Sequence, residues 1–299
     1  MLVKILVWNL QDFFIFLDKY SESKNLRNYT EPHWQQLTAS FNPNKELQKV
    51  MAISDLILKI NPDFCLFTEV AGRESLENLN RYFLKSTYNI FHSPSNSDRG
   101  IDIGVLAHQR WKGVCSQFHN HKDFARGLQQ ITFKYQQKKY HIFLTHLKSK
   151  LNKSGKDFEG RSQREIEVKR IIKIIKKLPP FEQNRSILSG DFNGIIYKEQ
   201  TEEELKPLIN KLKMKDVFEV LNKDFYDRST YCYFDKHKQL NPMQLDYCLL
   251  GSELHQYLLP QTCVLDFNGV ERTDFPISRE EKLKLPSDHY PVLTTLSLN

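Results

Sequence analysis

Apolar and polar positions repeat with two different periods along this chain, and the changes of period predict its elements. Over residues 46–60 the apolar side chains Val50, Ile53 and Ile57 recur at helical spacing, which predicts a helix that ends before Pro62. Short apolar runs bounded by polar residues predict buried strands. These runs cover residues 2–8, 64–68, 101–107, 129–135, 140–146, 186–190, 245–250 and 291–298.

A second amphipathic helix is predicted over residues 161–178, before two prolines. Its core-facing positions are Val168, Ile171, Ile172 and Ile175. Its solvent-facing positions are expected to be Arg164, Lys169, Lys173 and Lys176. Residues 11–45 and 265–287 are long connections, and connections of that length are usually functional or mobile.

The mixture of strands and helices predicts an α/β fold with two mixed β-sheets packed face to face and helices outside. The interior shows no repeat and no low-complexity linker, so we expect one domain over residues 1–299. The chain is 40% hydrophobic and 26% charged, as is typical of a soluble globular protein.

No run of about 20 apolar residues predicts a membrane span. The first residues lack the features of a signal peptide, which predicts a cytoplasmic protein and leaves signal-independent secretion open. The five cysteines form no C-x-x-C pair, which argues against a disulfide framework or a zinc site. Cys65 and Cys248 lie in apolar runs and are expected to be buried free thiols. We expect a monomer.

The net charge of +7 and the pI of about 9.0 favour partners that carry phosphates: nucleic acid, nucleotides or anionic lipid. A surplus of lysine on solvated faces without a binding role explains the same charge equally well.

Polar side chains stand at the ends of most of the predicted strands, where loops normally build functional sites. They are Asn9, Glu69, His146, Asp191, Asn193, Asp246, Asp288 and His289. Each has a structural explanation by itself: a strand-end Asn or Asp is more often a turn former or helix cap, and a histidine is often a satisfied core residue. Their joint occurrence favours a functional site.

These residue types suit one chemistry. Carboxylate and amide oxygens are hard ligands for Mg²⁺, Mn²⁺ or Ca²⁺. Imidazoles beside carboxylates can transfer protons or, when protonated, stabilise negative charge on a phosphate. A bound metal can polarise a phosphoryl oxygen. The set therefore predicts a metal-dependent phosphoesterase.

The sequence also resembles a known superfamily. The segments VWNLQD, PDFCLFTEV, THLKSK, SGDFNG, LDYCLL and SDHYPV occur in the order found in the endonuclease/exonuclease/phosphatase superfamily. That group includes pancreatic-type deoxyribonucleases, apurinic endonucleases, inositol polyphosphate 5-phosphatases and bacterial sphingomyelinases. The resemblance covers residues 3–297, and SGDFN and SDHYPV are its specific motifs. It implies a four-layered α/β sandwich with the site at one edge of the two sheets.

The resemblance also implies roles for the metal ligands and the groups around the attacking water. Glu69 would be the principal metal ligand, assisted by Asn9, and Asp288 would touch the metal or position its neighbour. Asp191 would orient or deprotonate the attacking water. Asn193 would hydrogen-bond the phosphate or the water.

Two histidines complete the implied site. His289 would bind the scissile phosphate and be oriented by Asp246. His146 would bind phosphate or act as a general acid.

Further residues carry weaker signals for substrate binding. Arg99 and Asp102 belong to an RGID segment found in bacterial members, where Arg99 would contact phosphate and Asp102 would support His146; a turn with a surface ion pair is the alternative. Arg126 would bind phosphate or be a surface charge. Lys148 begins a basic segment that would neutralise a polyanion or be a solvated loop.

The sequence departs from the pattern at two places. Gln11 stands where some members have an acidic residue, and TEV stands where QEV is common. The resemblance and the charge favour nuclease-like cleavage of nucleic acid with Mg²⁺ or Mn²⁺. The alternative is a phosphatase or phosphodiesterase that acts on a phospholipid head group, an inositol phosphate or a nucleotide, with the long connections shaping specificity. A binding module with an inactive site is a third hypothesis, against which the intact polar set argues.

Overall fold

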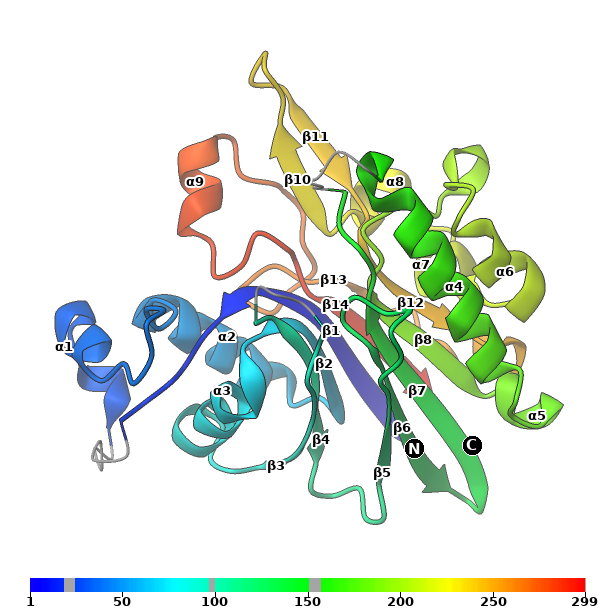
Figure 1. Ribbon diagram of the computed structural model, residues 1–299, viewed down its shortest axis with the longest axis horizontal. Helices are drawn as coiled ribbons and strands as arrows, with labels where there is room; N and C mark the ends of the chain where they lie inside the picture. Colours follow the sequence, from blue (N-terminus) through cyan, green and yellow to red (C-terminus); the bar gives the residue numbers. More distant parts are fainter. Residues whose placement is uncertain (19–24, 97–99, 151–156, 299) are drawn as a thin grey trace.

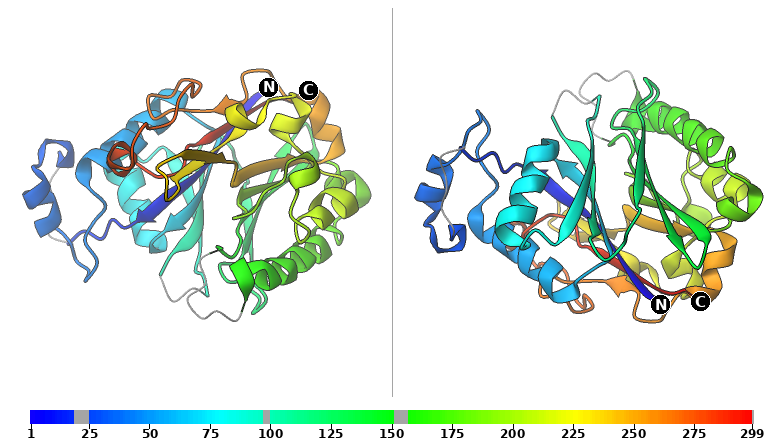
Figure 2. Two further views of the ribbon diagram at one scale, coloured as in Figure 1. Left: turned by 90° about the horizontal axis from the view of Figure 1, so that it is seen from above. Right: turned by 90° about the horizontal axis from the view of Figure 1, so that it is seen from below.

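Two mixed β-sheets stand face to face in the computed structural model, which describes residues 1–18, 25–96, 100–150 and 157–298 (Figures 1 and 2). The first sheet has the strand order β13-β14-β1-β2-β4-β3. In that order its strands are Cys263–Val264, Val292–Ser297, Leu2–Phe13, Phe64–Val70, Asp102–His108 and Tyr88–Ser93. Strands β1 and β2 pair in parallel, while their other neighbours pair antiparallel.

The second sheet has the order β5-β6-β7-β8-β12-β9. In that order its strands are Cys115–His119, Leu128–Tyr135, Lys138–His146, Ser186–Asp191, Asp246–Leu250 and Lys215–Asp216. Strands β7 and β8 are its parallel pair. Two further strands, β10 (Tyr231–Phe234) and β11 (Leu240–Met243), form a hairpin that projects from one end of the molecule near α9 (Arg279–Lys284) (Figure 1).

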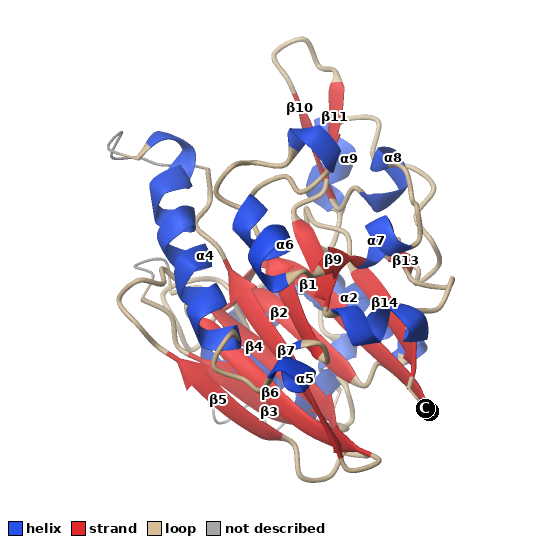
Figure 3. Cartoon of the chain, turned by 90° about the vertical axis from the view of Figure 1, so that its right-hand side faces the viewer, coloured by secondary structure: helices blue, strands red, loops and turns tan. Residues whose placement is uncertain are grey.

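Helices cover the outer face of each sheet (Figures 1 and 3). The first sheet carries α2 (Leu47–Ile60) and α3 (Gly72–Asn78), and α1 (Glu31–Gln36) lies beyond them. The second carries α4 (Arg161–Ile175) and α6 (Lys206–Leu212). Shorter helices connect the remaining strands: α5 (Pro180–Gln183), α7 (Val217–Val220) and α8 (Phe225–Arg228).

Three apolar clusters fill the spaces between these layers. Val7 and Ile142 belong to the central cluster between the two sheets. The next residue along β1, Trp8, points to the other face and packs with Ile53 of α2. Phe143, next to Ile142 on β7, packs in the cluster under α4 in the same way. Because successive side chains on a strand point to opposite faces, continuous apolar runs are needed for strands buried on both sides. The predicted α/β fold with two mixed sheets and outer helices, a four-layered sandwich, is confirmed.

The predicted helix over residues 46–60 corresponds to α2. Its apolar residues Val50, Ile53 and Ile57 are buried against the first sheet. The helix ends at Asn61, which adopts a left-handed conformation with φ of 49° and is followed by Pro62. Spacing, a C-terminal Asn and a following proline together made this helix predictable.

One expectation about α4 is wrong. Arg164 was expected to face solvent, but its side chain is fully buried and binds Glu204 Oε1 through Nε at 3.1 Å. The guanidinium also donates to Glu202 Oε2 at 3.1 Å and to the carbonyl of Glu159 at 2.7 Å. The loop that carries Glu202 and Glu204 covers this turn of the helix, and helical spacing alone cannot reveal that cover.

Two further findings concern the cysteines and the length and apolar character of the helices. All five cysteines are free, and Cys65 and Cys248 are buried as predicted. Among the described residues, none of the helices is both long and apolar enough to cross a membrane.

Candidate active site

Three strands of the second sheet bring three of the expected residues together at one end. Asp191, the last residue of β8, is the register partner of His146 on β7 and of Asp246 on β12. Gly190 makes this close pairing of β7 and β8 feasible, because its φ is +130° and a Cβ there would lie 1.9 Å from the carbonyl oxygen of Thr145. An ordinary side chain at position 190 would therefore push the two strands apart beside Asp191.

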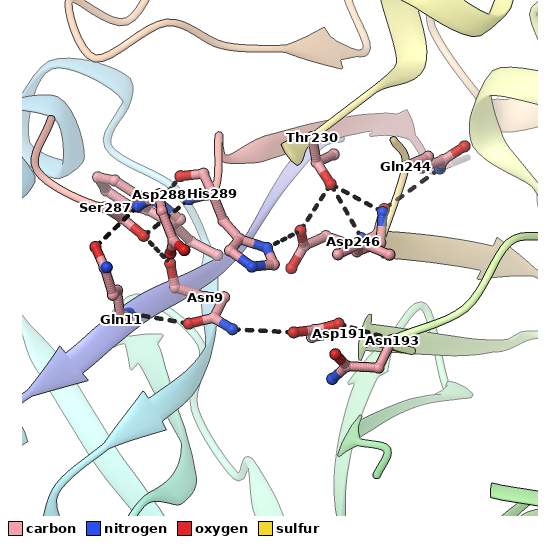
Figure 4. A network of polar contacts seen from close by, with 12 residues as sticks. Asn9, Gln11, Asp191, Asn193, Thr230, Gln244, Asp246, Ser287, Asp288 and His289 are labelled. Atoms are coloured by element: carbon pink, nitrogen blue, oxygen red, sulfur yellow. Dashed lines mark hydrogen bonds and ion pairs between the residues drawn. The ribbon is translucent and has the colours of Figure 1, made fainter. Parts of the chain in front are cut away.

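The first sheet contributes Asn9, which joins the two sheets at this end (Figure 4). Its Nδ2 donates to Asp191 Oδ2 at 3.0 Å, and only 2% of the residue is exposed. The neighbouring Trp8 donates from Nε1 to the carbonyl of His289 at 2.9 Å. Ser287 donates from Oγ to the carbonyl of Asn9 at 2.7 Å. The loop before β14 is thereby fixed against the end of β1.

His289 and Asp246 form a buried pair across the two sheets (Figure 4). The Nδ1 atom of His289 lies 2.7 Å from Asp246 Oδ2, which also accepts a hydrogen bond from Thr230 Oγ1 at 2.7 Å. Because Nδ1 is bonded to a carboxylate, Nε2 is the ring nitrogen left for a substrate. The ring of Tyr231 lies against the imidazole, with centroids 4.9 Å apart.

Burial and neighbouring charges shift the pKa values of two members of this cluster, His289 and Asp191. Burial alone would lower the pKa of His289, but the charge and hydrogen bond of Asp246 raise that pKa to about 10. Burial and the nearby Asp246 carboxylate raise the pKa of Asp191 to about 7. At neutral pH the imidazole is therefore a cation that can bind phosphate, and Asp191 is poised to accept a proton.

A set of hard oxygen donors lies on the other side of Asn9. Glu69 follows Thr68, the residue of β2 at which regular parallel pairing with β1 is interrupted, and it adopts a left-handed conformation with φ of 58°. Its Oε2 accepts a hydrogen bond from the amide of Asp12 at 3.2 Å. Gln11 accepts from the amide of Asp288 through Oε1 at 3.0 Å and donates its own amide to Asn9 Oδ1 at 2.9 Å. A left-handed conformation is strained in a non-glycine residue and persists where surrounding contacts fix it. These hydrogen bonds fix it.

These donors fit a divalent cation. Carboxylate and amide oxygens are the ligands that Mg²⁺ and Mn²⁺ prefer, and the described residues place no ion pair on Glu69 that would neutralise its charge. Asp191, Asp246 and His289 also lie close enough to share an ion, with one ligand atom each within 4.8 Å of the others. Asp246 Oδ2 already accepts two hydrogen bonds, while the buried Oδ1 has no hydrogen-bond partner among the described residues, so Oδ1 is the Asp246 oxygen left for such an ion.

Asn193 and His146 complete the polar cluster around Asp191. The amide of Asn193 donates to Asp191 Oδ1 at 2.8 Å, and its Nδ2 donates to the carbonyl of Leu147 at 3.1 Å. Asn193 adopts a left-handed conformation with a φ of 49°. The Nε2 atom of His146 lies 3.6 Å from Asp191 Oδ2.

The structure corrects the surface explanation of Arg126. Arg126 is only 4% exposed, and its Nη1 donates to the carbonyl of Leu147 at 2.9 Å. It therefore lies under the loop that follows His146. Lys148 is held in the same loop, with its amide donating to Glu167 Oε2 at 2.9 Å.

The contacts of Asp102 differ from the expectation that it supports His146. Its Oδ2 lies 2.7 Å from His92 Nε2 on the neighbouring strand, and its Oδ1 accepts from the amide of Ser95 at 2.7 Å. Asp102 is also buried, so it is not part of a surface ion pair. Arg99 falls outside the described residues.

Sequence reasoning missed several residues that shape the site. Thr230 and Tyr231 hold and cover the Asp246–His289 pair, and nothing in their local sequence marks them. Trp8 and Ser287 do stand inside the motifs VWN and SDH, so their positions beside Asn9 and His289 were available as a signal.

Comparison with known proteins decides the family. A profile described as Endonuclease/Exonuclease/phosphatase family matches residues 5–297. The chain belongs to the endonuclease/exonuclease/phosphatase family. It is therefore a divalent-metal-dependent phosphoesterase with the fold of that family. A search of curated protein sequences finds no significant match.

Solved structures of other proteins share this fold. One is D. rerio TDP2 complexed with single strand DNA product, which has 15% sequence identity, a TM-score of 0.60 and coverage of 99% of both chains. Another is the endonuclease domain of TRAS1, a telomere-specific non-LTR retrotransposon, with 11% identity, a TM-score of 0.56 and coverage of 99% of both chains. The human Nocturnin catalytic domain with bound sulfate anion has 17% identity and a TM-score of 0.59, and the match covers 100% of this chain and 95% of that chain.

Proposed function

We propose that this enzyme hydrolyses phosphodiester bonds in nucleic acid with the help of Mg²⁺ or Mn²⁺. The observation that carries the proposal is the contact set between the sheets: Asn9 bound to Asp191, and Asp246 bound to His289. In this proposal Asp191 is the proton acceptor and His289 a buried imidazolium, and Glu69 and Asp288 are the hard oxygen donors.

Each of these residues has its own role in the proposed hydrolysis. Asp191 accepts a proton from the attacking water, while Asn9 and Asn193 hold its two carboxylate oxygens in place. His289, kept protonated by Asp246, donates from Nε2 to a phosphate oxygen. His146 supplies a second imidazole on the other side of Asp191 for phosphate binding or for protonating the leaving group. Glu69, Asn9 and Asp288 would hold a cation, which would supply charge stabilisation to the phosphoryl group.

Nucleic acid is favoured as the substrate by charge and by comparison. The chain carries a net charge of +7, and Lys148 lies two residues after His146 in the loop beside the site. Among the similar structures, the TDP2 crystal holds a single-stranded DNA product, and TRAS1 supplies an endonuclease domain. Arg99 and Arg126 are further candidates for binding the substrate backbone. A phosphatase or phosphodiesterase acting on an inositol phosphate, a lipid head group or a nucleotide is the alternative.

A substrate panel tests the proposal directly. Single-stranded and double-stranded oligonucleotides, an inositol phosphate and a phospholipid are incubated with Mg²⁺, with Mn²⁺ and with EDTA. Cut strands that require a metal are expected, and release of inorganic phosphate or of a phosphorylated head group without cut strands would favour the alternative. Asp191→Ala should abolish cleavage while the circular dichroism spectrum is retained, and the exposed Asp55→Ala should leave cleavage unchanged.

A further inference from the structure

A groove of about 620 Å³ opens beside the metal-side donors, and all its walls come from residues 11–49. It begins at Gln11 and Asp12, which contact Asp288 and Glu69 respectively. Its volume falls within the range of about 300–1,000 Å³ in which proteins bind small molecules. A group attached to a phosphate at the active site could therefore reach it.

The lining of the groove combines amide side chains with one aromatic ring. Gln11, Gln35, Asn42 and Asn44 contribute amides, and the half-buried Phe14 contributes the ring. An amide carries both donors and acceptors, which is the pattern that reads the edge of a nucleobase. A phenyl ring offers a face on which a base can stack.

The charged residues of the lining balance one another. Lys45 and Lys49 face Asp12 and Glu46 in the same groove, and Lys49 Nζ lies 3.1 Å from Glu46 Oε1. Lys45 Nζ donates to the carbonyl of Gln11 at 2.8 Å. A site built for additional phosphates would carry excess positive charge. This lining instead suits a neutral polar group, which argues against an inositol phosphate.

Asn44 carries a buried side-chain donor without a partner among the described residues, which is the observation that indicates a ligand. Its Oδ1 accepts from the amide of Phe16 at 2.8 Å, and its backbone and the side chain of Gln35 exchange two hydrogen bonds at 2.8 and 3.0 Å. Its orientation is thereby fixed. Only 3% of Asn44 is exposed, and its Nδ2 has no acceptor among the described residues. Buried polar groups normally have a partner, and because this Nδ2 is also shielded from solvent, a ligand acceptor would reach it once the side chain turned toward the groove.

We propose that this groove binds the nucleobase next to the scissile phosphate, by stacking on Phe14 and by hydrogen bonds to the amides around Asn44. The proposal rests on the proposed function and adds to it a preference for a nucleotide unit over a bare phosphodiester. The long connection after β1 then serves as a specificity element.

Two esters with the same leaving group test this subsite: the p-nitrophenyl ester of thymidine 5′-monophosphate, and methyl p-nitrophenyl phosphate, which has no base. Phe14→Leu and Asn44→Asp should each raise KM for the nucleotide ester about tenfold, the loss expected for one hydrogen bond or stacking contact, and leave KM for the methyl ester unchanged. Asn44→Asp keeps the acceptor for Phe16 and removes the free donor. Phe41→Leu is the matched control, because Phe41 lies on the same segment, is fully exposed and is outside the groove.

The outcomes separate the two proposals. Equal losses on both esters, or no loss on either, would overturn the nucleobase subsite while leaving hydrolysis intact. If the wild-type enzyme cleaves neither these esters nor any oligonucleotide with any metal, the proposed function fails. The subsite is then decided by calorimetric titration with the four nucleoside 5′-monophosphates against ribose 5-phosphate. Binding that is no tighter for any of the nucleotides, or inositol 1-phosphate binding more tightly than all of them, would overturn it.

Discussion

The Oδ2 atom of Asp246 lies 2.7 Å from Nδ1 of His289, and both side chains are buried where the ends of the two sheets meet. Asp246 lies on β12 of the second sheet, and His289 precedes β14 of the first. The pair fixes the orientation of the imidazole and keeps it charged. Its contribution to catalysis can be measured by changing one atom.

Asp246→Asn replaces the carboxylate with an amide of the same shape. Because the amide no longer stabilises the imidazolium, kcat should fall by about two to four orders of magnitude. Steady-state cleavage of an oligonucleotide measures this. Thr230→Ser, which keeps the hydroxyl that bonds Asp246, is the control and should retain most activity. Equal activity of Asp246→Asn and the wild type would exclude the assigned role of Asp246.

The pH profile should report both buried groups. Asp191 must be ionised to accept a proton, so kcat/KM should rise through a pH of about 7, the pKa of Asp191. His289 must be protonated to bind phosphate, so kcat/KM should fall through a pH of about 10. The Asp246 charge raises both pKa values, and Asp246→Asn should therefore move both limbs to lower pH. Limbs that stay in place would show that other groups titrate.

Glu69→Gln should weaken metal binding. The substituted amide can still accept from the amide of Asp12, but it lacks the negative charge that attracts a hard cation. Calorimetric titration with Mn²⁺ should show affinity reduced by more than about tenfold. The exposed Glu74→Gln on α3 is the matched control and should bind Mn²⁺ like the wild type. Unchanged affinity in Glu69→Gln would remove Glu69 from the ligand set.

Arg164→Met should destabilise the fold. The substitution removes the closer cationic partner of Glu204, which is only 4% exposed and keeps the more distant Arg161, whose Nε lies 3.8 Å from Oε2. Loss of one member of a buried ion pair costs about 3–5 kcal/mol of unfolding free energy. Urea denaturation measures this. Lys169→Met breaks an exposed pair with Glu165 on the same helix and should cost at most about 1 kcal/mol. Similar losses in the two variants would contradict a special role for burial at Arg164.

Much of the site could be predicted because its residues follow buried strands. The apolar runs of β7, β8 and β12 end at or begin with His146, Asp191 and Asp246, so strand pattern and chemistry pointed to the same positions. The contacts around them could not be predicted. Thr230 comes from an irregular segment, and its hydrogen bond to Asp246 depends on tertiary structure alone.

The extent of β1 shows a second limit of prediction from the apolar pattern. The apolar pattern ends at Trp8, but the strand continues to Phe13 through a break in register after Asn9. Gln11 and Asp12 adopt positive φ values of 50° and 48° there, held by contacts with Asp288 and Glu69. Neither residue type marks such a backbone. The same limit applies to Arg164, since helical spacing identifies a face but not the loop that covers it.

The hydrogen bond from Asn9 to Asp191 joins two sheets that each hold only part of the polar cluster. Asn9 and His289 stand on one side of the central apolar cluster, and Asp191 and Asp246 on the other. A chain in which only one sheet has formed therefore cannot assemble the catalytic cluster. Recovery of phosphoesterase activity during refolding would time the docking of the two sheets, and a nascent or partly unfolded chain would be inactive.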